Sequence, residues 1–556
     1  METAAIYIPT ARRQALLRGR PLPDRESGAA LFADISGFTP LTETLARSLG
    51  PRRGAEELTR QLNRVYDALI DEVDRFGGSV ISFSGDAILC WFHEADGQAA
   101  LRAVTCALAM QAAMRPFAAV TLPNGATAAL AMKATVASGS TRRFVVGDPT
   151  IQLIDAVAGA TVTRTATAEH LAHKGEVLVD ETTLHQLGNA FRAIEWRAAP
   201  ETGERFALLA DLPAAVSVTA PDYVRGEPVS DELAGAWLLP AVNERLRAGL
   251  GEFLPELRPA VALFLRFEGI DYENDAAAGD KLDALTRWAQ NVIARYEGSL
   301  LALAIGDKGS YYHISFGAPV AHEDDPRRAV SAALELRAPP DGLSFIRPVQ
   351  IGISQGTFRA GAYGGMTRRT YGALGDDVNL AARLMQRAEP GEVLISGQIL
   401  KAVSALFVCE TLAPLQVKGK REPVPVARVL GRQHGRSAGA QYATPLIGRD
   451  TELQRLADSL QPILDGHFAG LLAVHGEPGI GKSRLLHEVH QRLEARQPLQ
   501  WFVWPAEGIL KQSLNPLQYF LREYFNLAPD LTEDLNKARF EEVLEGLLAQ
   551  LRRLPA

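Results

Sequence analysis

The chain has 556 residues, of which 47% are hydrophobic and 22% charged, and its formal net charge is −7. One hydrophobic core stops growing at about 250–300 residues, so this length predicts two to four domains. The acidic balance argues against a nucleic-acid partner, which would require a basic face. No apolar run reaches the roughly 18 residues needed to cross a bilayer.

The three cysteines, Cys90, Cys106 and Cys409, are scattered and form no CxxC pair. This usage is typical of a reducing compartment and argues against a zinc site. The first 20 residues contain no apolar segment of the kind found in signal peptides. We therefore expect a cytoplasmic protein without a membrane partner.

The predicted elements begin with a short apolar strand at 29–35, followed by a long helix with apolar residues at helical spacing between Leu58 and Val73. The pair Gly77-Gly78 ends this helix, and two strands joined at Gly85-Asp86 follow as a hairpin. The order strand–helix–strand–strand–helix–strand predicts a ferredoxin-like α+β fold.

A second apolar strand is predicted at 260–267, and the same order of elements follows it. The first 430 residues therefore contain a repeat of domain length. Four segment pairs occur in the same order, with offsets between 216 and 232 residues. Their first residues are Leu31 and Leu263, Phe83 and Ala304, Phe144 and Tyr371, and Gly175 and Gly391.

These features predict six segments, of which 27–195 is called the first copy below and 259–432 the second copy. The other four are an N-terminal segment 1–26, a connector 196–258, a polar linker 433–444 and a C-terminal part 445–556.

The segments FADISGFT and FSGDAILCWF of the first copy and YGALGDDVNLAARLM of the second resemble the signatures of class III nucleotidyl cyclases. The tandem arrangement resembles the soluble, bicarbonate-responsive adenylyl cyclases in particular. The resemblance implies two ferredoxin-like cyclase domains that form an intramolecular pseudo-dimer. It covers residues 27–430 and implies that one chain is sufficient for an active site that converts ATP to cyclic AMP.

The first copy carries the predicted metal site. Asp34 ends a predicted strand and Asp86 lies in a predicted hairpin turn, so the two carboxylates can hold two Mg²⁺ or Mn²⁺ ions against a triphosphate. The resemblance implies further contacts, which are a metal contact from the Ile35 carbonyl and phosphate contacts from Gly37, Phe38 and Lys133. The second copy has Arg266 in the place of Asp34, and a cation there would repel Mg²⁺.

The second copy carries the other half of the predicted site. Asn379 and Arg383 lie four residues apart on one helix face, and the resemblance implies that they contact the ribose and the α-phosphate. When the two copies are aligned on their Gly-Asp pairs, Ile151 and Asp155 occupy these places in the first copy. The two copies are therefore predicted to be complementary.

Lys308 matches the lysine that recognises adenine in the family, whereas guanylyl cyclases usually have Glu there. The position of the second base contact, Asp or Thr in the family, falls on Gly372, which offers only backbone groups. Adenine is therefore favoured over guanine.

The resemblance also implies a second, vestigial pocket that binds bicarbonate. Arg164 and Met385 match residues of that pocket, but Ser82 stands where the family has its lysine. An anion would therefore be held more weakly.

The segment HGEPGIGKS is a complete P-loop, which follows an apolar segment, GLLAVH, read as a strand, and precedes a helix, so we expect an α/β NTPase portion with a second nucleotide. Its phosphate-binding residues are Gly476, Gly481, Lys482 and Ser483. No acidic strand of the Walker B type follows, which predicts a truncated module without ATPase activity.

Two alternatives to an adenylyl cyclase remain open. One is a non-catalytic sensor, in which the tandem copies bind nucleotide and regulate the P-loop module. The other is a guanylyl cyclase, which Lys308 disfavours.

Overall fold

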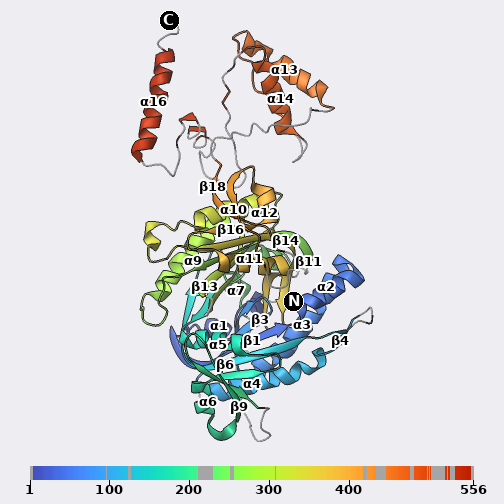
Figure 1. The fold of residues 1–556 in the computed structure, drawn as a ribbon, viewed down its shortest axis with the longest axis vertical. Helices are drawn as coiled ribbons and strands as arrows, with labels where there is room; N and C mark the ends of the chain where they lie inside the picture. The colour runs from blue at the N-terminus through green and yellow to red at the C-terminus, as the bar shows by residue number, and fades with distance from the viewer. Residues whose placement is uncertain are drawn as a thin grey trace. The chain divides into compact units, whose positions relative to one another are not determined.

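The computed structural model is shown in Figure 1. It describes residues 4–95, 97–122, 125, 127–210, 229–250, 256–306, 309–416, 423–433, 446, 448–475, 481–497 and 533–551, with isolated residues between 499 and 527. The chain divides into two compact units, Met1–Gly431 and Arg432–Ala556.

The first half of the larger unit is built on a mixed sheet, in which eight strands lie within the described residues. Its strand order is β2-β3-β1-β6-β8-β10-β9, with β7 paired to β6, and β6–β8 is a parallel pair. The strands are β1 (Arg25–Ser36), β2 (Ser79–Ser84), β3 (Ala87–His93), β6 (Ala131–Val146), β7 (Ile154–Ala158), β8 (Val177–Asp180), β9 (Ala193–Ala198) and β10 (Arg205–Leu209). The helices are α2 (Phe38–Leu49), α3 (Pro51–Arg75), α4 (Ala99–Ala113), α5 (Ala160–Leu171) and α6 (Glu181–Leu187), and a small ribbon joins β4 (Val120–Thr121) to β5 (Thr127–Ala128).

The second half repeats this arrangement. Its sheet has the order β12-β13-β11-β14-β16-β18-β17, with β15 paired to β14 and β14–β16 parallel. The strands are β11 (Glu256–Phe267), β12 (Ser299–Gly306), β13 (Gly309–Phe316), β14 (Gln350–Gly364), β15 (Arg369–Leu374), β16 (Val393–Ser396), β17 (Phe407–Thr411) and β18 (Val426–Arg432). The helices are α9 (Ala278–Arg295), α10 (Asp325–Leu336), α11 (Asp376–Arg387) and α12 (Gly397–Val403). The two sheets confirm the predicted duplication and the α+β fold.

The central strand β1 shows why this fold places the predicted metal residues together. Asp34 lies opposite Ala87 of β3 and Lys133 of β6 in the sheet register. The alternate residues Leu31, Ala33 and Ile35 are fully buried, as expected of a strand with one face in the core. Asp34 therefore lies on the other face, at the end of the strand where the β2–β3 turn begins.

The register of the strands corrects one sequence alignment. Gly159 immediately precedes α5 and Gly375 immediately precedes α11, and each follows the strand that pairs with β6 or β14. Gly147-Asp148 instead lies between β6 and β7, outside any helix. The alignment on Gly-Asp pairs was therefore wrong, and Thr163 and Thr167, not Ile151 and Asp155, occupy the places of Asn379 and Arg383.

The N-terminal segment and the connector share a small core of their own. The segment forms a short 3-10 turn (Ala4–Tyr7) and α1 (Thr10–Arg18), and the connector forms α7 (Asp231–Gly235) and α8 (Pro240–Arg247). Ala4 and Ile8 pack with Trp237 and Leu238 of the connector and with Tyr371 of β15. Strand β9 crosses the start of the predicted connector at residue 196, and β10 lies inside it, but both strands belong to the first sheet.

The C-terminal unit contains α13 (Asp450–Leu464), α14 (Lys482–Glu494) and α16 (Glu533–Leu551). Leu453 of α13 packs against Leu485 and Val489 of α14. The segment 470–475, which was expected to be a strand before the P-loop, forms no regular structure, and Leu471 is 98% exposed. That expectation was wrong, because no neighbouring strand among the described residues of this unit pairs with the segment.

Candidate functional site

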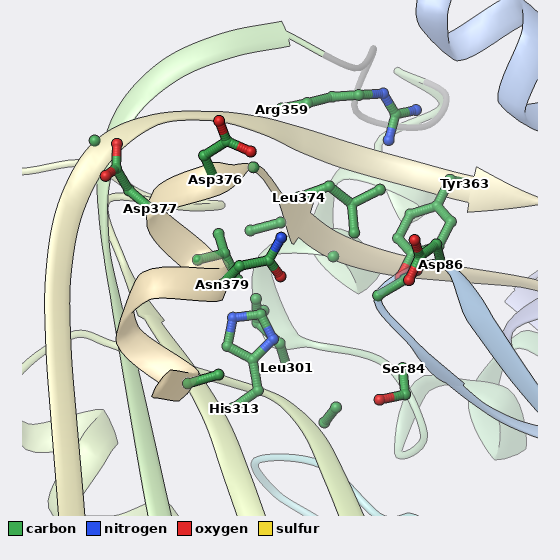
Figure 2. Close-up of a pocket in the computed structure, with 18 of the residues that line it drawn as sticks. Ser84, Asp86, Leu301, His313, Arg359, Tyr363, Leu374, Asp376, Asp377 and Asn379 are labelled. Carbon is green, nitrogen blue, oxygen red and sulfur yellow. The ribbon is translucent and has the colours of Figure 1, made fainter. Parts of the chain in front are cut away.

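A cavity of about 710 Å³ lies between the first and second copies and is called the shared pocket below (Figure 2). Phe38 and the turn Ser84–Asp86 line it from the first copy. From the second copy it is lined by β11 to β15 and the beginning of α11, including Gly372 and Asn379. Its volume suits a ligand of nucleotide size, since small-molecule pockets usually span about 300–1,000 Å³.

Asp34 and Asp86 come together at one end of this pocket. The backbone N–H of Ile35 donates to the carbonyl of Asp86 at 3.2 Å and so joins the end of β1 to the β2–β3 turn. Asp86 is open to solvent on one side, while protein atoms crowd its other side. This crowding and the nearby Asp34 carboxylate raise the pKa of Asp86 to about 7.

The residues at this end fit divalent cations. Two carboxylates that repel each other, beside a cavity large enough for a polyphosphate, are the donor set that Mg²⁺ and Mn²⁺ prefer. Asp86 faces the pocket directly, whereas Asp34 and Ile35 lie behind the turn and are not among the residues that line the cavity.

The remaining phosphate contacts expected from the first copy are only partly at the pocket. Phe38 lines it and begins α2. Gly37 has φ +107°, and a Cβ there would lie 2.4 Å from the Ala129 carbonyl oxygen, so this position requires glycine. The Lys133 ammonium lies 2.5 Å from Glu169 Oε1 and 3.7 Å from Asp34 Oδ2, so a phosphate would have to compete with Glu169.

From the second copy, α11 brings Asn379 to the pocket, and the side chain is exposed there (Figure 2). Arg383 lies one turn further along α11 and is partly buried, but it does not line the cavity. Gly372 lines the pocket from β15, where Tyr363 covers it. Lys308 lies outside the described residues, so its expected contact with the base stays a prediction.

Two pocket residues were missed by the sequence analysis. His313 on β13 stacks on Phe264 with ring centroids 4.4 Å apart, and burial lowers the pKa of its imidazole to about 4. Arg359 on β14 is buried at the wall of the shared pocket that lies opposite His313 (Figure 2). A signal was available for Arg359, because the chain carries a charged residue there between the apolar residues Phe358 and Ala360.

A smaller cavity of about 110 Å³, called the second pocket, lies between α5, β7 and the β12–β13 strands. Ser82 lines it as expected, but Arg164 and Met385 do not. Arg164 donates to Asp180 Oδ2 at 2.8 Å, and Met385 is buried in the core of the second copy. The ionisable groups among the described lining residues, apart from a tyrosine, are Asp155 and Glu169, which disfavour an anion.

Asp155 is ionised although it is buried, because two buried arginines surround it. Its carboxylate lies 3.1 Å from Arg12 of α1 and 2.6 Å from Arg143 of β6. Burial alone would raise the pKa of Asp155, but the two guanidinium groups hold it below its usual range. This network attaches the N-terminal helix to the first copy.

At the P-loop the structure describes only part of the predicted site. Gly481, with φ +98°, precedes α14, and Lys482 is the first residue of that helix. Gly476 and the Ser483 side chain lie outside the described residues. None of the helices that the structure describes is both long enough and apolar enough to span a bilayer.

The duplicated mixed sheets, with a pocket between them, form a tandem pair of domains of the class III cyclase type. Residues 23–200 and 297–427, together more than half of the chain, match the family described as adenylate and guanylate cyclase catalytic domain. The chain therefore belongs to that family. Residues 445–556 match the AAA ATPase domain family.

Among curated proteins, the chain is 26% identical to adenylate cyclase type 10 of Rattus norvegicus over 532 residues, which cover 88% of this chain and 32% of the relative. It is 23% identical to adenylate cyclase type 10 of Homo sapiens, with 84% and 31% covered. The chain thus spans about a third of the length of these relatives.

Among solved structures, a class III adenylyl cyclase-like ATP-binding protein from Pseudomonas aeruginosa aligns with a TM-score of 0.45 and 14% identity over 68% of this chain and 85% of that one. The adenylyl cyclase CyaB from P. aeruginosa aligns with a TM-score of 0.29 and 23% identity over 33% of this chain and 98% of that one.

Proposed function

We propose that the chain is an adenylyl cyclase that converts ATP to 3′,5′-cyclic AMP and pyrophosphate at the shared pocket. The observation that carries this proposal is the composition of the pocket walls. Asp86 of the first copy and Asn379 of the second copy line the same cavity. The counterpart of Asp34 in the second copy is Arg266, and the counterpart of Arg383 in the first copy is Thr167, so each copy lacks what the other provides.

The proposed reaction is the attack of the ribose 3′-oxygen on the α-phosphorus, with loss of a proton from the hydroxyl and departure of pyrophosphate. Asp34, Asp86 and the Ile35 carbonyl would hold two Mg²⁺ or Mn²⁺ ions. Such ions supply Lewis-acid stabilisation of the attacking and leaving oxygens when bound. Asn379 would orient the ribose, and Arg383 would stabilise the charge that builds on the α-phosphate. Arg383 does not line the cavity. Its side chain would therefore have to turn toward the nucleotide in order to reach the α-phosphate.

The choice of adenine rests on Lys308, with the backbone at Gly372 as the second contact. Gly372 cannot supply the carboxylate or hydroxyl found at this place in the family, so discrimination against GTP is expected to be weaker than a side-chain contact would give.

The test is to incubate the protein with ATP or GTP and Mn²⁺ and to separate the cyclic products by chromatography. Cyclic AMP should form, and Asp34→Ala and Arg383→Ala should each abolish it. Thr167→Ala is the matched control, because Thr167 occupies the place of Arg383 in the first copy and donates only to the carbonyl of Thr163. Equal loss in the control would mean that the copies do not divide the work as proposed.

Gly372 also leaves room for the sensor alternative. Nucleotide binding at the shared pocket with no cyclic product from ATP or GTP would replace the proposed enzyme with a nucleotide-binding module, and cyclic GMP as the main product would indicate a guanylyl cyclase.

We also propose that the C-terminal unit binds a second nucleotide through Lys482, which lies at the N-terminus of α14 where a phosphate would be favoured. A Lys482→Ala variant should bind one nucleotide per chain fewer than the unmodified protein.

Bicarbonate stays a testable ligand of the second pocket, although the carboxylates there oppose it. A cyclic AMP rate that does not respond to bicarbonate at fixed pH would exclude it as an activator.

A further inference from the structure

Arg359 is a buried cation at the wall of the shared pocket. Its residue is only 2% exposed, and it lies in β14 between Leu257 of β11 and Leu374 of β15. Its Nε donates to Thr59 Oγ1 of α3 at 2.8 Å, so the side chain reaches across to the first copy. Its two terminal nitrogens are buried and have no hydrogen-bond partner among the residues that the structure describes.

This arrangement leaves the charge of Arg359 uncompensated. In the described part of the chain no carboxylate lies within ion-pair distance of the guanidinium group, and the neutral ring of Tyr363 lies 5.7 Å from its Cζ. Burial lowers the pKa of Arg359 to about 10, so the group is still protonated at neutral pH. A buried charge without a partner is costly, and proteins usually pair it with an opposite charge.

The first copy shows how this fold neutralises an arginine at the same place. In the two sheets Gly28 pairs with Gly139 and Ala260 with Gly356, and three residues further along Arg142 and Arg359 occupy equivalent positions. Arg142 lies 2.6 Å from Asp24 Oδ2 and donates to the carbonyls of residues 272 and 275. Arg142 is therefore saturated, whereas Arg359 is left for a ligand.

The position of Arg359 indicates which part of a nucleotide it would meet. Tyr363 contacts the guanidinium group on one side, and its hydroxyl donates to the Gly85 carbonyl at 3.5 Å on the other. Gly85 precedes Asp86 in the turn that carries the proposed metal site. Arg359 therefore lies near the metal end of the pocket, and Figure 2 shows it on a different wall from His313 and Asn379.

We propose that Arg359 binds the phosphate chain of the nucleotide from the second copy, a role that rests on the nucleotide-binding function proposed above. A planar guanidinium with two donor nitrogens suits phosphate oxygens. Arg359 would add a cation beside the metal ions.

The test measures binding separately from catalysis. The full chain carries Lys482→Ala to remove the proposed P-loop nucleotide, and its affinity for α,β-methylene-ATP, for inorganic tripolyphosphate and for adenosine is measured by calorimetry with Ca²⁺. Arg359→Met should weaken both phosphate-bearing probes by about 10- to 100-fold, the range expected when one charge-assisted hydrogen bond is lost. Adenosine affinity should stay unchanged, and Arg359→Lys should recover part of the loss. The matched control is Arg347→Gln, since Arg347 is an exposed arginine that pairs with Glu268 at the surface.

A second readout separates ligand binding from a structural role. Without ligand, Arg359→Met should unfold at the same temperature as the unmodified protein or higher, because the substitution removes an uncompensated charge. The stabilisation by tripolyphosphate should be lost. Unchanged affinity for tripolyphosphate, or a ligand-free midpoint several degrees lower with affinity retained, would overturn the proposal.

The outcome for Arg359 is distinguishable from that of the cyclase proposal. If no cyclic product forms but phosphate affinity depends on Arg359, the enzyme proposal fails and the binding role stands. If cyclic AMP forms and Arg359→Met keeps both its KM and its tripolyphosphate affinity, the enzyme proposal stands and the role of Arg359 is wrong.

Discussion

Gly372, at the position of the second base contact, is where the structure makes a quantitative prediction about the stability cost of adding a side chain. A Cβ at Gly372 would lie 2.6 Å from Cε1 of Tyr363 and 3.2 Å from its hydroxyl oxygen. The Tyr363 ring is 4% exposed and packs against Tyr66 and Phe83, with ring centroids 5.7 Å apart in each case. The ring therefore has little room to move when a side chain is added.

The expected cost follows from two opposing effects. Forcing a methyl group into a packed core costs about 1–3 kcal/mol, while replacing glycine by alanine inside a strand returns about 0.5–1 kcal/mol. Taken at the middle of each range, Gly372→Ala should therefore lower the free energy of unfolding by about 1 kcal/mol. Gly372→Asp should cost more, because its carboxylate would also have to displace the ring to reach the pocket.

The assay is urea unfolding of the full chain followed by tryptophan fluorescence, with Gly372→Ala, Tyr363→Leu and the double variant compared. Shortening Tyr363 removes the clash, so the double variant should be more stable than the sum of the two single effects by about 1 kcal/mol or more. A Gly372→Ala variant as stable as the unmodified protein, or strictly additive effects, would refute the steric argument. Restoring the acidic side chain of the family would then be possible by one substitution.

Three further predictions concern other parts of the larger unit. Asp155→Asn leaves two buried arginines without their carboxylate and should lower the free energy of unfolding, measured in urea, by about 3–5 kcal/mol. The same substitution should lower it much less in a variant that already carries Arg12→Met. The pKa of His313 is about 4 in the folded protein and about 6.5 in the unfolded chain. As pH falls from about 6.5 to 4, the imidazole therefore takes up a proton in the unfolded chain but not in the folded one, and the free energy of unfolding decreases in that window. His313→Leu should flatten this decrease, and a pH series of unfolding midpoints with an unchanged slope would contradict the assignment. Gly37→Ala should lose the proposed cyclic AMP production and lower the melting temperature, because the residue has positive φ and a carbonyl oxygen within 2.4 Å of the new Cβ; full activity would show that the loop relaxes.

The duplication and the fold were predictable from sequence because hydrophobic periodicity and the order of elements survive in both copies. The strand before Asp34 and the hairpin at Gly85-Asp86 lie where the pattern predicts them. These features depend on local physics, namely alternating burial in strands and glycine at turns.

The alignment of the Gly-Asp pairs failed for a physical reason. Glycine with positive φ is needed both in the turn between β6 and β7, at Gly147 with φ +107°, and before α5, at Gly159 with φ +122°. A two-residue motif cannot distinguish these two uses of glycine. Only the strand register shows that Gly159 is the counterpart of Gly375.

The uncompensated charge of Arg359 and the ring over Gly372 could not be derived from sequence. Both depend on contacts between residues far apart in the chain, such as Arg359 with Thr59 and Tyr363 with Gly85, which lie 300 and 278 residues apart. The apolar run at 470–475 shows the opposite case, in which a local pattern predicts a strand but no partner strand is present among the described residues.

The two walls of the shared pocket belong to one polypeptide, and this has a consequence for how the site responds to protein concentration. Closing the pocket is an intramolecular event, governed by the effective concentration of one copy around the other. Nucleotide affinity per chain should therefore be the same at nanomolar and micromolar protein. A pocket built from two identical chains would instead be lost by dissociation on dilution and would be present twice in each symmetric dimer.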